Sequence, residues 1–73
     1  MGRGKPSSLK TEIYDSILKD IIEGNYKQNE IINEKQLIEK YGVSKSPIRD
    51  ALIELCSEGV LISQPRYGYE VVR

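Results

Sequence analysis

The segment Tyr41–Leu52 constrains the fold of this chain more than any other part of the sequence. Gly42 supplies the backbone freedom that a sharp turn needs. Ser44 belongs to the residue types favoured just before a helix, and Pro47 is tolerated in a first helical turn, where backbone N–H groups lack helical partners. The segment therefore predicts a tight turn that leads into a helix starting near residue 45.

Apolar residues at helical spacing continue after this turn and predict that one face of the helix is buried. They are Ile48, Ala51, Leu52, Leu55 and Cys56. Lys45, Ser46 and Arg49 fall outside this stripe, so the first turn of the helix should present basic and polar groups to solvent. A helix anchored on one side, with a basic and exposed first turn, is suited to entering the major groove of DNA.

The preceding part of the chain predicts two earlier helices and one short strand. The three helices are expected at about residues 8–23, 34–41 and 45–58. Asn33 can cap the second helix, and Gly24 and Gly59 can end the first and the third. Residues 30–32 form a short β-branched stretch between polar residues and are a strand candidate. The first helix should bury a stripe that consists of Leu9, Ile13, Ile17, Leu18, Ile21 and Ile22.

After Gly59 the pattern changes from helical spacing to that of a β-hairpin. Residues 60–64 are a strand candidate, residues 65–68 have turn chemistry, and residues 69–72 alternate as a returning strand. Three helices followed by a hairpin is the order of a winged helix-turn-helix. The expected fold is therefore mainly α with a small β-hairpin wing, and its core should combine the inner faces of the helices with one face of the hairpin.

Length and composition narrow the range of functions. The 73 residues suffice for one domain with a modest core, and no apolar run approaches the ~20 residues of a membrane span. The absence of histidine excludes common catalytic triads and most zinc sites, so we expect no enzyme activity, no metal and no cofactor in this domain. The single cysteine, Cys56, is expected to be a buried core thiol, which fits a reducing cytoplasm.

Charge is balanced in total but not along the chain. Eleven basic and eleven acidic residues give zero net charge, which counts against strong non-specific binding to nucleic acid. Acidic residues dominate the first predicted helix, whereas lysine and arginine outnumber Glu34 and Glu39 in the middle of the chain. A polarised domain can therefore present a basic face to phosphates although its total charge is zero.

Together these motifs resemble the GntR family of bacterial transcription regulators. The matching residues are, in order, Ile22–Tyr26, Glu34, Leu37, Tyr41–Leu52, Leu55, Glu58–Gly59 and Gly68. The resemblance covers about residues 9–73 and leaves residues 1–8 as a flexible basic tail. It implies a winged-helix DNA-binding domain that forms homodimers through a separate C-terminal domain, which binds a small effector molecule. We therefore expect this chain to be the N-terminal domain of a longer regulator, most often a repressor of a pseudo-palindromic operator.

The resemblance also implies where the DNA contacts fall. The basic positions of the family pattern match Lys35, Lys45 and Arg49, and the wing glycine matches Gly68. Lysine replaces the commoner arginine at positions 35 and 45, and lysine lacks the planar fork that recognises guanine with two hydrogen bonds. With polar neighbours in the turn and the wing, the predicted DNA-binding set is Lys35, Ser44, Lys45, Ser46, Pro47, Arg49, Arg66, Tyr67 and Gly68.

Several of these residues have a second interpretation. Arg49 could pair with an acidic residue on a helix surface, and Lys45 could simply be solvated. Ser44 and Ser46 are expected to cap the third helix as well as to approach a phosphate oxygen. Gly68 could be a requirement of the turn alone. At the level of the whole chain, the alternative is a winged-helix protein-interaction module without DNA binding, which zero net charge favours slightly and which predicts no salt-dependent DNA affinity.

Overall fold

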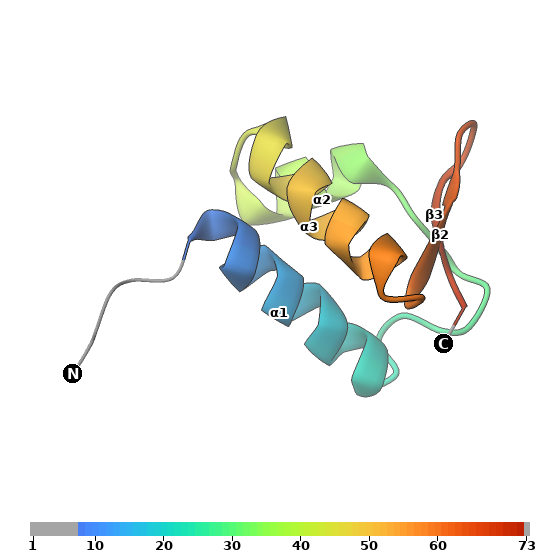
Figure 1. Ribbon diagram of the computed structural model, residues 1–73. Helices are drawn as coiled ribbons and strands as arrows, with labels where there is room; N and C mark the ends of the chain where they lie inside the picture. The colour runs from blue at the N-terminus through green and yellow to red at the C-terminus, as the bar shows by residue number, and fades with distance from the viewer. Residues whose placement is uncertain (1–7, 73) are drawn as a thin grey trace.

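The computed structural model describes residues 8–72, so most of the predicted basic tail, residues 1–7, and Arg73 lie outside the described part of the chain. Three helices pack together, and a three-stranded antiparallel sheet lies at one end of them (Figure 1). This arrangement confirms the predicted winged helix-turn-helix, mainly α with a small β wing. The elements are α1 (Leu9–Ile22), β1 (Ile31–Ile32), α2 (Glu34–Tyr41), α3 (Lys45–Ser57), β2 (Leu61–Gln64) and β3 (Gly68–Val71).

Local hydrogen bonds and one glycine explain where α1 begins and where α2 begins and ends. The Ser8 hydroxyl oxygen accepts a hydrogen bond from the Thr11 N–H at 3.1 Å. The side-chain oxygen of Asn33 accepts one from the Lys35 N–H at 2.7 Å. Gly42 ends α2 in the left-handed conformation, with φ of 66°, which glycine adopts without steric cost. The predicted roles of Asn33 as a cap and Gly42 as a turn residue are therefore confirmed.

The start of α3 differs from expectation in one respect. Ser44 occupies the N-cap position, as predicted, but its side chain makes no capping hydrogen bond. Ser46 is the second residue of α3 and therefore lies inside the helix. The predicted capping by these two hydroxyls is wrong, and both residues are exposed at the start of α3. Pro47 lies in the first turn, where its missing N–H breaks no helical hydrogen bond.

The central strand of the sheet is β3, which pairs with β2 in the wing and with β1 on its other side. The strand order is β1-β3-β2, and both neighbours run antiparallel to β3. The wing turn is closed by a hydrogen bond from the Tyr67 N–H to the Gln64 carbonyl at 2.8 Å. Sequence analysis predicted a short strand at residues 30–32 but not its pairing, which joins the wing to the segment leading into α2.

Gly68 begins β3 and is needed for the close approach of β1. Its φ is 130°, and a Cβ atom placed on it would lie 2.5 Å from the carbonyl oxygen of Ile32. The turn predicted at residues 65–68 is formed by residues 65–67, so Gly68 follows the wing tip as the first residue of β3. Because Ile32 is followed directly by Asn33, the cap of α2, this approach also sets the position of α2 relative to the wing.

The core lies between the three helices and the inner face of the sheet. Two residues of the predicted α1 stripe are not part of it: Leu9 is 50% exposed and Ile22 is 75% exposed, because they lie at the two ends of the helix. Cys56 is half-buried rather than buried, and desolvation raises the pKa of its thiol. The buried apolar residues are Ile13, Ile17, Ile32, Leu37, Ile48, Ala51, Leu52, Leu55, Val60, Leu61 and Val71.

Polar side chains join α1 to the other two helices around this core. The pairs are Lys10 with Glu54 at 2.7 Å, Asp20 with Lys40 at 3.3 Å, Ser16 with Tyr41 at 2.9 Å, and Tyr14 with Glu58. Donation of the Tyr14 hydroxyl to the Glu58 carboxylate raises the pKa of Tyr14 to about 12. The position of α1 thus depends on side-chain contacts from one end of the helix to the other.

Candidate nucleic-acid interface

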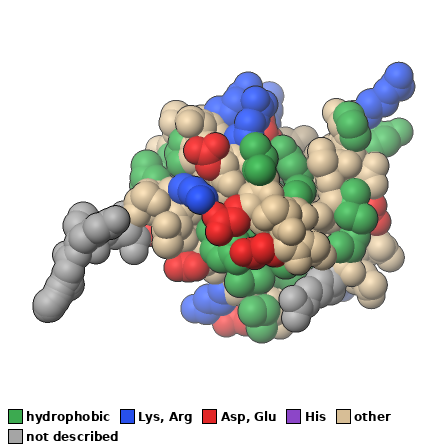
Figure 2. All heavy atoms as spheres, in the orientation of Figure 1, with side chains coloured by type: hydrophobic (Ala, Val, Ile, Leu, Met, Phe, Trp, Pro, Cys, Tyr) green, Lys and Arg blue, Asp and Glu red, His purple; other side chains and the backbone are tan. Residues whose placement is uncertain are grey.

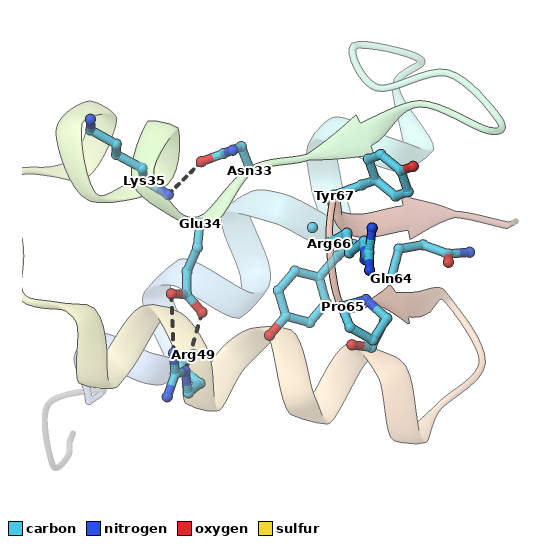
Figure 3. Close-up of a pocket in the computed structure, with 11 residues that line it drawn as sticks. Asn33, Glu34, Lys35, Arg49, Gln64, Pro65, Arg66 and Tyr67 are labelled. Carbon is cyan, nitrogen blue, oxygen red and sulfur yellow. Dashed lines mark hydrogen bonds and ion pairs between the residues drawn. The ribbon is translucent and has the colours of Figure 1, made fainter.

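A groove of about 400 Å³ lies between the N-terminal end of α2, the first half of α3 and the wing (Figure 3). It combines residues from segments that are distant in sequence. Among the residues predicted to contact DNA, those that line the groove are Lys35, Arg49, Arg66, Tyr67 and Gly68. The structure therefore brings together the predicted residues of α2, α3 and the wing.

The other predicted residues, Ser44, Lys45, Ser46 and Pro47, lie at the start of α3 and do not line this groove. Figure 2 shows Lys and Arg side chains gathered over this end of α3 and at the wing tip. Figure 1 shows that both reach the same edge of the molecule. We call the surface formed by residues 44–49 and by the wing turn, residues 65–67, the basic edge.

Acidic side chains occupy a different part of the surface. Figure 2 shows Asp and Glu side chains over α1 and α3, with some Lys or Arg side chains among them. Two of the acidic residues that the sequence places on the first helix, Glu12 and Asp15, are exposed on α1. Most acidic side chains on this face therefore lie over α1 and α3, and the basic clusters lie at the basic edge, although the sum over the chain is zero.

Arg49 forms an ion pair with Glu34 inside the groove (Figure 3). The Arg49 Nε donates to Glu34 Oε2 at 3.2 Å, and Nη2 donates to Oε1 at 3.4 Å. These bonds raise the pKa of the guanidinium further above its ordinary value. The side chain of Arg49 nevertheless stays 52% exposed. The predicted alternative, a pair with an acidic residue on a helix surface, is confirmed, and the side chain remains open to a further partner.

The basic residues of α2 and the wing point in different directions. Figure 3 shows the side chain of Lys35 extending away from the wing, whereas Arg66 and Tyr67 lie at the wing turn. All three residues are exposed, and Tyr67 is 69% exposed. Lys35 and Arg66 therefore present their charges at separate points of the surface.

Three groove residues have roles that sequence reasoning did not assign. Gln64 donates a hydrogen bond to the Glu70 carboxylate at 2.9 Å across the wing. Tyr69 lies beside the Arg49–Glu34 pair; desolvation and the charge of Glu34 raise the pKa of Tyr69, while Arg49 lowers it. Glu34 is visible in the sequence as a position of the family pattern. Its partner lies on another helix, so no local pattern could connect the two.

The chemistry of the described residues favours anionic oxygen over a metal ion. Among residues 8–72, no group of three or more His, Cys, Asp and Glu side chains is arranged to hold a metal. Nor does any helix in that range have the length and apolar character needed to cross a bilayer. Exposed lysine, arginine and hydroxyl donors at the basic edge are groups that bind phosphate oxygens.

The fold is a winged helix-turn-helix, in which α2 and α3 form the helix-turn-helix and β2 and β3 form the wing. The basic edge combines the start of α3 with the turn of the wing. The model of the gntR family of bacterial regulatory proteins matches residues 9–71. The chain belongs to this family, as the DNA-binding domain of a transcription regulator.

Individual relatives agree with this assignment. A Bacillus subtilis (strain 168) protein, described as the uncharacterized HTH-type transcriptional regulator YdhC, is 39% identical over 67 residues, 92% of this chain and 30% of that protein. The solved structure of AraR(DBD) in complex with operator ORR3 has a TM-score of 0.89 and 27% identity, and the match covers 99% of this chain and 88% of that one. The structure of Lar, described as controlling the agr system of Listeria monocytogenes, has a TM-score of 0.83 and 29% identity over 94% of this chain and 32% of that one. The chain thus spans about a third of the length of two of these relatives.

Proposed function

We propose that this domain recognises operator DNA for a ligand-responsive bacterial transcription regulator, most often a repressor. The first turn of α3 enters the major groove, and the wing lies alongside. The observation that carries the proposal is the position of the basic first turn of α3 and the wing turn at one edge, with acidic side chains on another part of the surface. Because DNA is a polyanion, the exposed basic side chains of this edge attract it.

The residues predicted from the sequence divide into two kinds of contact. Arg49 has a planar fork that matches the O6 and N7 acceptors of guanine, whereas lysine acts as a point charge and suits phosphates. The division is supported by Arg49 and Lys35 lining the groove and by exposed lysine at the basic edge. The proposed contact set is Lys35, Ser44, Lys45, Ser46, Pro47, Arg49, Arg66, Tyr67 and Gly68.

The proposal extends to the assembly in which the domain works. Two relatives are about three times as long as this chain, and AraR(DBD) is described in complex with an operator. We infer that a C-terminal domain joins two copies into a homodimer and binds a small-molecule effector in the bacterial cytoplasm. The operator is then a pseudo-palindrome with two half-sites. One domain alone should bind more weakly than the pair, since the second half-site raises the effective concentration.

The alternative function is a winged-helix protein-interaction module, which the zero net charge favours. The two functions differ in their response to salt. Binding to DNA releases counterions, and the logarithm of affinity falls with the logarithm of salt concentration by about 0.9 for each phosphate neutralised. A protein-interaction module has no such dependence on duplex DNA.

The proposal is tested by selection from random duplex DNA, followed by fluorescence anisotropy of the selected duplex at two salt concentrations. We expect enrichment of a short half-site and weaker binding at the higher salt concentration. Arg49→Glu should weaken specific binding by more than about tenfold, because it removes a base contact and adds a repulsive charge. Lys19→Glu is the matched control: it reverses one charge on α1, away from the basic edge, and should bind like the parent protein.

Each arm of this experiment has a result that contradicts the proposal. If the folded protein enriches no sequence, alone or fused to a dimerisation module, operator recognition is wrong and the interaction module is favoured. If Arg49→Glu binds the selected duplex as tightly as the parent protein, Arg49 is not a DNA contact. Circular dichroism of both variants should match the parent protein, so that loss of binding is not loss of fold.

A further inference from the structure

The Glu34 carboxylate occupies one defined edge of the Arg49 guanidinium. The two hydrogen bonds come from Nε and from one of the terminal nitrogens, Nη2, at 3.2 and 3.4 Å. A guanidinium carries five N–H donors in a rigid plane. The pair with Glu34 therefore uses the Nε edge and leaves free the edge formed by the two terminal nitrogens, which is itself a two-donor fork.

Glu34 is well placed to hold this orientation. It is the first residue of α2, where the helix dipole favours a negative charge, and Asn33 caps the helix directly before it. Its side chain is only 21% exposed, compared with 52% for Arg49. Tyr69 lines the same part of the groove. The carboxylate is thus anchored on α2 while the guanidinium on α3 reaches into the groove.

We propose that Glu34 is a positioning residue that sets the sequence specificity of Arg49, by turning the free edge of the guanidinium toward a guanine and by offsetting its charge against phosphates. This inference rests on the proposed DNA-binding function. The Arg49–Glu34 pair is neutral as a unit, so a phosphate gains little by contacting it. A guanine edge gains two hydrogen bonds from the free fork. Attraction to phosphates is left to Lys35, Lys45 and Arg66.

The decisive variant is Glu34→Gln, which keeps the size of the side chain and removes its charge. Its matched control is Glu39→Gln, the same change at an exposed position later in α2. For both variants and the parent protein, anisotropy measures the affinity for the selected duplex and for duplexes with one G·C pair replaced, each over a series of salt concentrations. For Glu34→Gln we expect the ratio of specific to mismatched affinity to fall by about tenfold.

The salt dependence distinguishes positioning from a merely structural role. In Glu34→Gln the Arg49 charge is no longer offset, so the salt slope should steepen by about 0.9 and binding to mismatched DNA should tighten. Glu34→Asp keeps the charge but withdraws the carboxylate by one methylene group. It should lose specificity with no change in the salt slope. Glu39→Gln should match the parent protein in the specificity ratio.

Several outcomes would overturn the inference. One is that Glu34→Gln and Glu39→Gln have the same specificity ratio, and another is that Glu34→Gln weakens specific and mismatched binding equally. A parent protein that shows no salt-dependent binding contradicts the proposed function itself, and the parent arm alone reveals this. If Glu34→Gln does not fold, the specificity ratio of Glu34→Asp compared with that of the parent protein still tests the inference. In the ¹H–¹⁵N NMR spectrum of the parent protein, a slowly exchanging Arg49 Nε–H supports the pair, and a rapidly exchanging one contradicts it.

Discussion

Two charged side chains of α1 pair with neighbours on other helices, whereas at the basic edge several basic side chains are exposed. Lys10 pairs with Glu54 at 2.7 Å, and Lys40 pairs with Asp20 at 3.3 Å. At the basic edge Arg49 pairs with Glu34. Three further basic residues of the groove and the basic edge take part in none of the ion pairs within residues 8–72. They are Lys35, Lys45 and Arg66.

This difference shows why a net charge of zero does not exclude a polyanionic partner. Lys10 and Asp20 of α1 are each neutralised by a partner on another helix, while exposed positive charge is present at the basic edge, where phosphates can approach. Exposed pairs such as Lys10–Glu54 contribute little to the stability of a fold, because solvent screens them. The stability of the α1 side therefore rests mainly on its apolar core, and the position of the wing rests on a backbone contact at Gly68.

Among substitutions in the two regions, we expect the largest loss of stability at Gly68, in the wing. An alanine Cβ would meet the Ile32 carbonyl oxygen at 2.5 Å, at a φ of 130° that residues with side chains rarely adopt. We expect Gly68→Ala to lower the free energy of unfolding by about 3 kcal/mol, because backbone strain and a close contact add. Urea unfolding followed by circular dichroism measures this loss.

The matched control is Gly24→Ala, at the turn that follows α1. Gly24 also has a positive φ, of 84°, but no atom lies within 4 Å of its added Cβ. Strain alone should lower the free energy of unfolding by about 1 kcal/mol. Equal losses in the two variants would show that the approach of β1 to β3 does not require glycine.

A smaller effect is expected on the α1 side, at Tyr14. Its hydrogen bond to Glu58 raises the pKa of Tyr14 from 10.0 to about 12. The tighter hold on this proton stabilises the folded state fully below pH 10, and the stabilisation is lost as the pH rises from 10 to about 12. The difference in unfolding free energy between the parent protein and Tyr14→Phe should therefore shrink over that range.

Urea unfolding of the parent protein and Tyr14→Phe at pH 8, 10 and 11 measures this difference. Both proteins share their other titrating groups, so subtraction isolates Tyr14. A difference that stays constant over these pH values would mean that the Tyr14–Glu58 bond does not form in solution. In that case α1 is held against the C-terminal end of α3 by one contact fewer than the structure has.

Local signals in the sequence predicted most of the fold. Asn33 and Gly42 act on backbone groups within a few residues of themselves, so their effects are visible without a partner segment. The apolar spacing of α3 predicted its buried face for the same reason. The Ser44 hydroxyl shows the limit of such signals, because the residue occupies the N-cap position while its side chain forms no cap.

Features that depend on distant segments could not be predicted in this way. The need for glycine at position 68 follows from β1 lying beside β3, and the Arg49–Glu34 pair follows from how α3 lies against α2. Periodicity placed Leu9 and Ile22 on the inner stripe of α1, but it does not show where the neighbouring elements end. Sequence reasoning therefore named five residues that line the groove, but the groove itself follows from how α2, α3 and the wing pack together.

The claim that the basic edge, and not the α1 side, faces DNA is tested most directly by ¹H–¹⁵N NMR titration of the parent protein with the selected duplex. We predict that the amide signals of residues 35, 44–46, 48–49 and 66–68 shift, while the signals of α1 stay in place; Pro47 and Pro65 have no amide proton and give no signal. Shifts centred on α1, or no shifts at saturating duplex, would contradict the claim.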